Sequence, residues 1–186
     1  MCPDAGLVPR MSEGIDTKTW PNINAFFKDV NARAFRFAEY GLRSREDAMD
    51  AVQDAMLKML AYGDRPANEW TPLFWRILRT RVIDMQRRRK FRLSWMLGGV
   101  EEDSSVAWAD TSADPARAHD NREAFEHFSV AMGKLPARQR EAFNLRVLEE
   151  LDVATTASVM GCSEGSVKTH LSRARAALQP YLEDFS

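Results

Sequence analysis

Apolar residues recur at steps of three and four along most of the chain, which is the spacing of one buried face of an α-helix. The pattern predicts a first helix over about residues 21–41 and a second over 44–62, in which Ser44 is a favourable N-cap. A third is expected over about 70–89, beyond the break that Gly and Pro make at 63–68. No alternation of apolar and polar residues is long enough to predict a strand, so we expect an all-α fold.

The second helix has two contrasting faces. The inward face is predicted to consist of Ala48, Ala51, Val52, Ala55, Met56, Met59 and Leu60. The opposite face is mainly acidic and consists of Asp47, Asp50, Gln53, Asp54 and Lys58. Such a face is either simply solvated or complementary to a basic partner.

Two shorter apolar faces follow each other near the end of the chain. They are made of Leu151, Ala154, Ala157 and Met160, and of Val167, Leu171, Ala174 and Leu178. Between them, Gly161 is predicted to end a helix in the left-handed conformation, and Ser163 or Glu164 to favour the start of the next. Two short helices joined around a Gly form the helix-turn-helix pattern, whose second helix enters a major groove of DNA.

The composition changes over residues 93–120, where Gly, Ser, Ala and Asp prevail and no helical period is sustained. We interpret this stretch as a flexible acidic linker between two small helical domains. The expected organisation is a tail at 1–19, a first domain at 20–92, the linker, and a second domain at 121–183.

Cationic residues are concentrated on two helices, although the net charge is only −1 and the pI is about 6.3. The third helix carries Arg76, Arg79, Arg81, Arg87, Arg88, Arg89, Lys90 and Arg92, opposed only by Asp84. The last helix presents Ser166, Lys168, Thr169, Ser172, Arg173 and Arg175 opposite its apolar face. Either face alone could be merely solvated, but hydroxyls and cations together suit phosphates and base edges.

Other classes of site find little support in the sequence. Cys2 and Cys162 are too few and too far apart for a disulfide framework or a structural zinc site, and they fit a reducing cytoplasm. His119, His127 and His170 are dispersed, so we expect no catalytic residue, metal, cofactor or small-molecule substrate. No apolar run approaches the roughly 20 residues that span a bilayer, and no signal peptide is evident, so we expect a cytoplasmic chain without membrane insertion.

Three segments in this order resemble a known family. EDAMDAVQDAMLKML at 46–60 resembles region 2 of bacterial sigma factors, and WTPLFWRILRTRVIDMQRRRKFR at 70–92 is similar to the promoter-melting part of that region. LPARQREAFNLRVLEELDVATTASVMGCSEGSVKTHLSRARAAL at 135–178 resembles region 4, with SVKTHLSRAR its most specific piece. The two-domain size is similar to the extracytoplasmic-function (ECF) class of the sigma-70 family. The chain departs from the family at Thr80, where Asn is frequent, and at Met56, where an aromatic residue is common.

The resemblance implies a non-catalytic factor that binds core RNA polymerase, reads and melts the −10 promoter element, and reads the −35 element. It assigns core binding to Asp47, Asp50, Gln53 and Asp54. It assigns DNA binding to Arg76, Arg79, Thr80, Arg81, Asp84, Arg87, Arg88, Arg89, Lys90, Ser166, Lys168, Thr169, Ser172, Arg173 and Arg175. The implied partners are core RNA polymerase, promoter DNA and an anti-sigma factor.

Two rival readings differ in what they require. A repressor or activator that binds an operator directly would share the last two helices but would need neither the acidic helix nor the melting segment. An enzyme of nucleic-acid metabolism would need converging carboxylates, a phosphate-binding loop or a metal set, and the sequence offers none of these patterns.

Overall fold

A computed structural model of the chain describes residues 20–96 and 119–182. This part of the chain is helical throughout, with short turns and without strands, as the apolar spacing predicts. The N-terminal half consists of α1 (Ile23–Leu42), α2 (Arg45–Leu60), the 3-10 turn η1 (Ala67–Glu69) and α3 (Trp70–Met96). The C-terminal half consists of α4 (His119–Lys134), α5 (Ala137–Phe143), the π-helical turn η2 (Asn144–Leu148), α6 (Val153–Met160) and α7 (Glu164–Leu182).

Local side-chain bonds set the start of the first two helices. The side-chain Oδ1 of Asn22 accepts from the backbone N–H of Ala25 at 2.9 Å, which satisfies one of the free donors at the start of α1. The Ser44 hydroxyl accepts from the backbone N–H of Asp47 at 3.2 Å, which confirms the predicted N-cap of α2. Between the two, Arg43 ends α1 in the left-handed conformation with a φ of 52°.

An aromatic core joins α1 to α3. The Phe26 ring meets the edge of Phe74 at 5.5 Å between centroids, and Phe37 meets Trp75 at 5.4 Å. Such edge-to-face pairs add stability beyond the apolar area that they bury. The two helices lie close together at Gly41, where an added Cβ would lie 2.7 Å from a methyl group of Val82. A side chain at this position would therefore push α1 away from α3.

The C-terminal half contains the expected helix-turn-helix. Gly161 ends α6 with a φ of 63°, and the Ser163 hydroxyl accepts from the backbone N–H of Ser166 at 3.2 Å at the start of α7. Both observations confirm the sequence prediction. On α7, Val167, Ala174 and Leu178 are buried as predicted.

The sequence patterns misplace three features. Leu60 is 53% exposed, not inward, because it shares the outer side of α2 with Leu57, three positions earlier, whereas the preceding residue Met59 is buried. Ala154 is exposed because the buried side of α6 is formed by its neighbours Thr155 and Thr156. Helix α3 continues to Met96 and α4 begins at His119, so both run into the stretch assigned to the linker. The rest of that assignment, and the tail at 1–19, lie outside the described residues.

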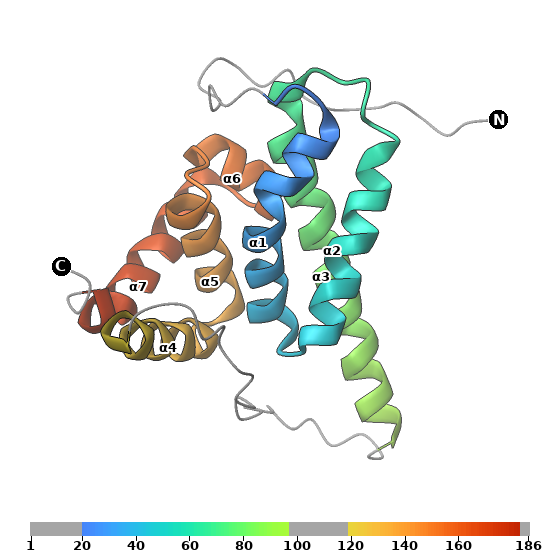
Figure 1. The fold of residues 1–186 in the computed structure, drawn as a ribbon. Helices are drawn as coiled ribbons and strands as arrows, with labels where there is room; N and C mark the ends of the chain where they lie inside the picture. The colour runs from blue at the N-terminus through green and yellow to red at the C-terminus, as the bar shows by residue number, and fades with distance from the viewer. Residues whose placement is uncertain (1–19, 97–118, 183–186) are drawn as a thin grey trace.

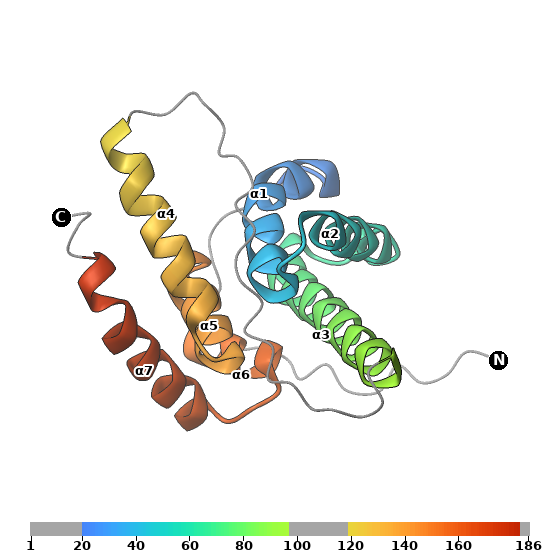
Figure 2. The ribbon, with the colours of Figure 1, turned by 90° about the horizontal axis from the view of Figure 1, so that it is seen from below.

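The two halves pack against each other. Helices α5 and α6 lie against α1 and α3, while α7 lies on the far side of the C-terminal half (Figures 1 and 2). Buried residues of α6, such as Val159 and Met160, belong to the same apolar core as Phe74 and Trp75 of α3. In the other direction, Tyr40 of α1 is buried among α4 and α7 residues. The chain therefore has two helical units, as expected, with a common core between them.

Candidate nucleic-acid interface

The outer face of α7 is the most accessible of the predicted DNA-binding surfaces. Lys168, Thr169, Ser172, Arg173 and Arg175 are all exposed, and Ser166 is half-buried beside Ser163. Lys168, Arg173 and Arg175 form no ion pair within the described residues, and the Thr169 hydroxyl donates a hydrogen bond to the carbonyl of Gly165 at 3.0 Å. The cations of α7 are thus directed to solvent.

Helix α6 and the turn before it hold α7 in place. The Asp152 carboxylate accepts from the backbone N–H of Thr155 at 2.7 Å and from its hydroxyl at 2.8 Å, which fixes the start of α6. The backbone N–H of Cys162 donates to the carbonyl of Ala157 at 3.1 Å and closes the turn. With Val167 fully buried at the start of α7, this framework leaves the polar face of α7 outward.

His170 on α7 is half-buried, and its Nδ1 is buried without a hydrogen-bond partner among the described residues.

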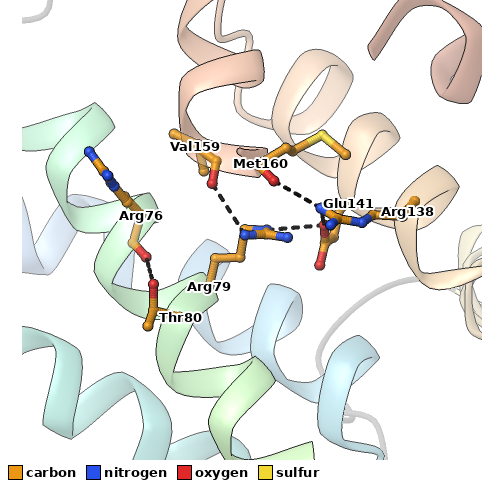
Figure 3. A network of polar contacts seen from close by, with 7 residues as sticks. All are labelled: Arg76, Arg79, Thr80, Arg138, Glu141, Val159 and Met160. Atoms are coloured by element: carbon orange, nitrogen blue, oxygen red, sulfur yellow. Dashed lines mark hydrogen bonds and ion pairs between the residues drawn. The ribbon is translucent and has the colours of Figure 1, made fainter. Parts of the chain in front are cut away.

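The predicted DNA-binding residues in the first part of α3 are divided between two environments. Arg76 and Thr80 are exposed, and the Thr80 hydroxyl donates to the carbonyl of Arg76 at 2.8 Å. Arg79, by contrast, keeps only 11% of its side chain exposed. Its Nε donates to the carboxylate of Glu141 at 3.1 Å, and its Nη1 donates to the carbonyl of Val159 at 3.4 Å (Figure 3). Arg79 therefore points into the contact between the halves.

Arg138 completes this contact from α5. Its Nη1 donates to the carbonyl of Met160 at 2.9 Å and lies 3.5 Å from the same Glu141 carboxylate oxygen (Figure 3). Glu141 thus lies between two guanidinium groups, one from each half. Arg33 of α1 makes a further ion pair between the halves, at 2.6 Å from the carboxylate of Glu149, whose side chain is 1% exposed.

Arg81 connects two predicted surfaces. Its Nη2 lies 2.6 Å from the carboxylate of Asp54 on α2, so a residue assigned to DNA pairs with one assigned to the polymerase. The pair is partly exposed, at 30% and 46%, and pairs of this kind contribute little to stability. Asp84 is half-buried further along α3.

The last turns of α3 combine exposed cations with exposed aromatic rings. Arg87, Arg88 and Lys90 are exposed, while Arg89 donates to the carbonyl of Leu42 at 3.1 Å. Phe91 is 73% exposed and Trp95 is 84% exposed. The sequence analysis missed this pair. Its signal was present in the spacing of four between two aromatic residues beside a basic run, which places both on one side of a helix.

The outer face of α2 is more apolar than predicted. Asp50, Gln53 and Asp54 are exposed, whereas Asp47 is half-buried near the N-cap. Beside them lie the exposed side chains Met49, Leu57 and Leu60. Carboxylates next to a row of apolar side chains resemble a protein-binding surface more than a solvated face.

Burial changes two titrations where the halves meet. Burial raises the pKa of Tyr40, while a hydrogen bond to the Ser129 hydroxyl, at 3.3 Å, opposes the shift. Burial also lowers the pKa of Arg140, and nearby Arg43 lowers it further. Both groups are polar side chains enclosed by the contact between the halves.

Within residues 20–96 and 119–182, no three His, Cys, Asp or Glu side chains are grouped so that they could hold a metal ion. None of the helices in these ranges is long and apolar enough to cross a membrane.

The chain matches known proteins over both halves. Residues 126–178 match the family described as Sigma-70, region 4. The ECF RNA polymerase sigma factor EcfG of Rhodopseudomonas palustris (strain TIE-1) is 31% identical over 160 residues, which is 82% of this chain and 82% of that protein. The ECF RNA polymerase sigma factor SigM of Mycobacterium tuberculosis is 30% identical over 162 residues, covering 84% of this chain and 74% of the relative.

Solved structures with the same helical arrangement include two complexes. The sigma factor RpoE of Bartonella quintana, in complex with the anti-sigma factor NepR, matches with a TM-score of 0.62 and 26% identity over 85% of this chain and 96% of the other. CnrH, in complex with the cytosolic domain of CnrY, matches with a TM-score of 0.57 at 19% identity over 88% of this chain and 89% of the other. The second likeness concerns the fold alone.

Proposed function

Since this chain belongs to the ECF class of RNA polymerase sigma factors, which act in transcription initiation without a catalytic step of their own, we propose how its surfaces divide that work. Helix α2 binds core RNA polymerase, α3 reads and melts the −10 element, and α7 reads the −35 element. The observation that carries the proposal is the outward set of cations on α7 of a complete helix-turn-helix, which have no ion-pair partner in residues 20–96 and 119–182.

On α7, Arg173 and Arg175 are the side chains long enough to reach base edges in the major groove. A guanidinium can donate two parallel hydrogen bonds to guanine, whereas a hydroxyl such as that of Thr169 bonds a base or a phosphate singly. Lys168 supplies a further phosphate contact near the start of the helix. The buried Val167 and Ala174 fix the rotation of α7, so these residues approach DNA together.

On α2, the exposed carboxylates of Asp50 and Asp54 favour approach to a basic surface of the polymerase. The neighbouring side chains of Met49, Leu57 and Leu60 can then bury apolar area in the complex. The charges set orientation and rate, and the apolar row supplies most of the affinity.

On α3, melting requires groups that stabilise unpaired bases. Thr80 and Asp84 can hydrogen-bond an extruded base, and Arg76 can hold a neighbouring phosphate. The exposed rings of Phe91 and Trp95 offer stacking surfaces for bases, with Arg87 and Arg88 beside them on the same helix to hold the backbone.

An anti-sigma factor is a further proposed partner. The support is the 26% identical RpoE, whose structure is a complex with the anti-sigma factor NepR. We place the chain in the cytoplasm, where core RNA polymerase is found.

The proposal is tested by run-off transcription with purified core RNA polymerase on a library of promoter fragments. Transcripts should appear only when the chain and the core enzyme are both present, and they should start downstream of one shared pair of elements. Specific binding of the chain alone to an operator, with no dependence of transcription on it, would favour the direct regulator instead.

A further inference from the structure

One side of α3 is accessible to solvent along most of the helix. Residues at steps of three or four lie on the same side of a helix. The outer stripe of α3, defined by such steps, consists of Arg76, Thr80, Asp84, Arg87, Phe91 and Trp95. All of these side chains are exposed except Asp84, which is half-buried. At a rise of about 1.5 Å per residue the stripe is roughly 28 Å long, so it extends well beyond the residues to which base reading is assigned.

Packing fixes the direction in which this stripe faces. Trp75, Leu78 and Val82 are buried on the opposite side of α3. Nearer the end of the helix, the Arg89 guanidinium donates to the carbonyl of Leu42 at 3.1 Å. Beyond that contact α3 continues past the turn between α1 and α2 (Figure 1). The last part of the stripe is therefore not covered by either helix.

Two aromatic rings occupy this last part. Phe91 is 73% exposed and Trp95 is 84% exposed, although large rings gain free energy when they leave water. They lie four positions apart, which separates them by about 6 Å along the helix axis. Adjacent exposed rings of this kind indicate a contact surface, and each of the two can receive one flat ligand.

The surrounding charges determine which ligand fits. Arg87 and Arg88 lie one turn before Phe91, and Lys90 and Arg92 lie about 100° to either side of it. These four side chains are exposed and form no ion pair within residues 20–96 and 119–182, and residues 85–96 include no Asp or Glu. The matching ligand is a polyanion with flat apolar faces.

An unpaired DNA strand has both properties, because its phosphates bind cations and its bases stack on rings. In a duplex the faces of the bases are covered by their neighbours. A membrane surface favours a continuous apolar face with cations on the polar side, whereas here cations lie on both flanks of the rings.

Resting on the proposed function, we propose that Phe91 and Trp95 form a stacking site for two unpaired nucleotides that lie outside the −10 element. Phe91 is about 16 Å along α3 from Thr80, so the bases on the rings are not those read at Thr80. The site accepts any base, since every base has a flat face. It holds the melted strand and does not select the promoter.

The first experiment measures binding of the purified full-length chain to a fluorescein-labelled strand of 12 thymidine nucleotides by anisotropy. Phe91→Ala with Trp95→Ala should weaken this affinity at least about tenfold, because stacking on both rings is lost. Phe91→Tyr with Trp95→Phe keeps the rings and should stay within about threefold of the wild-type affinity. The control Leu148→Ala truncates an exposed apolar side chain of η2 and should change nothing.

An abasic strand of equal length separates stacking from charge, since it keeps the phosphates and lacks the bases. The wild-type chain should bind it at least about tenfold more weakly than the thymidine strand, whereas the double alanine variant should bind the two strands equally. Lys90→Gln should lower the salt dependence by about one unit on both strands and leave the base-dependent difference intact. Circular dichroism checks that each variant is folded.

A second experiment uses the polymerase holoenzyme on a promoter fragment. The double alanine variant should start transcripts at the same promoters as the wild-type chain, but its open complexes should decay about tenfold faster after heparin is added. A change in promoter preference would instead make the rings readers of sequence and contradict the holding role.

Three results would overturn the stacking site. They are equal wild-type affinity for the thymidine and abasic strands, a folded double alanine variant that binds the thymidine strand as the wild type does, and ring-dependent binding to phosphatidylglycerol vesicles without any dependence on bases. The last would assign the surface to a membrane. In each case, core-dependent transcription by the wild-type chain would leave the proposed function standing, whereas absence of that transcription would contradict the proposed function itself.

Discussion

The two cationic helices α3 and α7 have similar side chains but different surroundings. On α7, Lys168, Arg173 and Arg175 face solvent around a buried apolar stripe. On α3, Arg79 is bound by the C-terminal half and Arg81 by Asp54 of α2. The difference teaches that the number of cations on a helix does not measure its capacity to bind DNA. What counts is how many of those cations already have an anionic partner within the fold.

The largest predicted effect is on stability and concerns the packing of α7. Leu178→Ala removes a fully buried side chain and should lower the free energy of unfolding by about 2–5 kcal/mol, because it leaves a cavity where α7 packs against α4 and α5. Thermal unfolding followed by circular dichroism measures the change. Ala177, the residue before it, is exposed, so Ala177→Ser should change the free energy of unfolding by less than about 0.5 kcal/mol. Equal losses of stability in the two variants would show that Leu178 is not buried as described.

Helix α7 illustrates what can be predicted from sequence. Its apolar spacing, the left-handed Gly161 and the Ser163 cap are local features, and each is confirmed. The environment of Arg79 is not local, because its partner Glu141 lies 62 positions further along the chain. A weak signal existed, since Arg79 is one helical turn from both Trp75 and Val82 and so borders the buried face of α3.

The exposed side of α2 is another feature that the sequence pattern predicted only in part. Helical periodicity identifies one apolar face, and it assigned Leu60 to the interior because Leu60 continues that face by one turn. Met59 in the same turn is fully buried, so the true buried face is narrower than the predicted one, and Leu60 remains exposed beside Leu57. The roles of the individual site residues on α2, α3 and α7 are predictions for experiments to test.

The next largest effect is on DNA binding by α7, and it shows whether an arginine there contacts a base or only a phosphate. Arg173→Ala should weaken binding of the polymerase holoenzyme to its preferred −35 element by roughly 1–3 kcal/mol, if the guanidinium bonds a guanine edge. Competition binding against a fragment with a substituted −35 element measures the specificity. If the variant loses the same affinity on both fragments, Arg173 contacts phosphate and does not read a base.

A smaller effect, on polymerase binding, is expected from substitutions on α2. It should differ between two carboxylates to which the same role is assigned. Asp50→Lys should weaken association with core polymerase by about 1–2 kcal/mol, with most of the change in the association rate, because its carboxylate is exposed at the rim. Asp54→Lys should act on the polymerase and also release Arg81 from its ion pair. Stopped-flow association at two salt concentrations checks the first expectation. An unchanged rate for Asp50→Lys would remove this residue from the interface.

The smallest effect compares two arginines of α3 directly through the salt dependence of DNA binding by the free chain. Arg88→Gln should reduce the slope of log affinity against log salt by about one unit, because Arg88 is exposed and each neutralised phosphate releases about one counterion. Arg79→Gln should leave that slope unchanged, since its guanidinium already binds Glu141. Equal slopes for the two variants would mean that Arg79 contacts DNA in spite of this ion pair, and the difference between α3 and α7 would then lie in geometry and not in the pairing of charges.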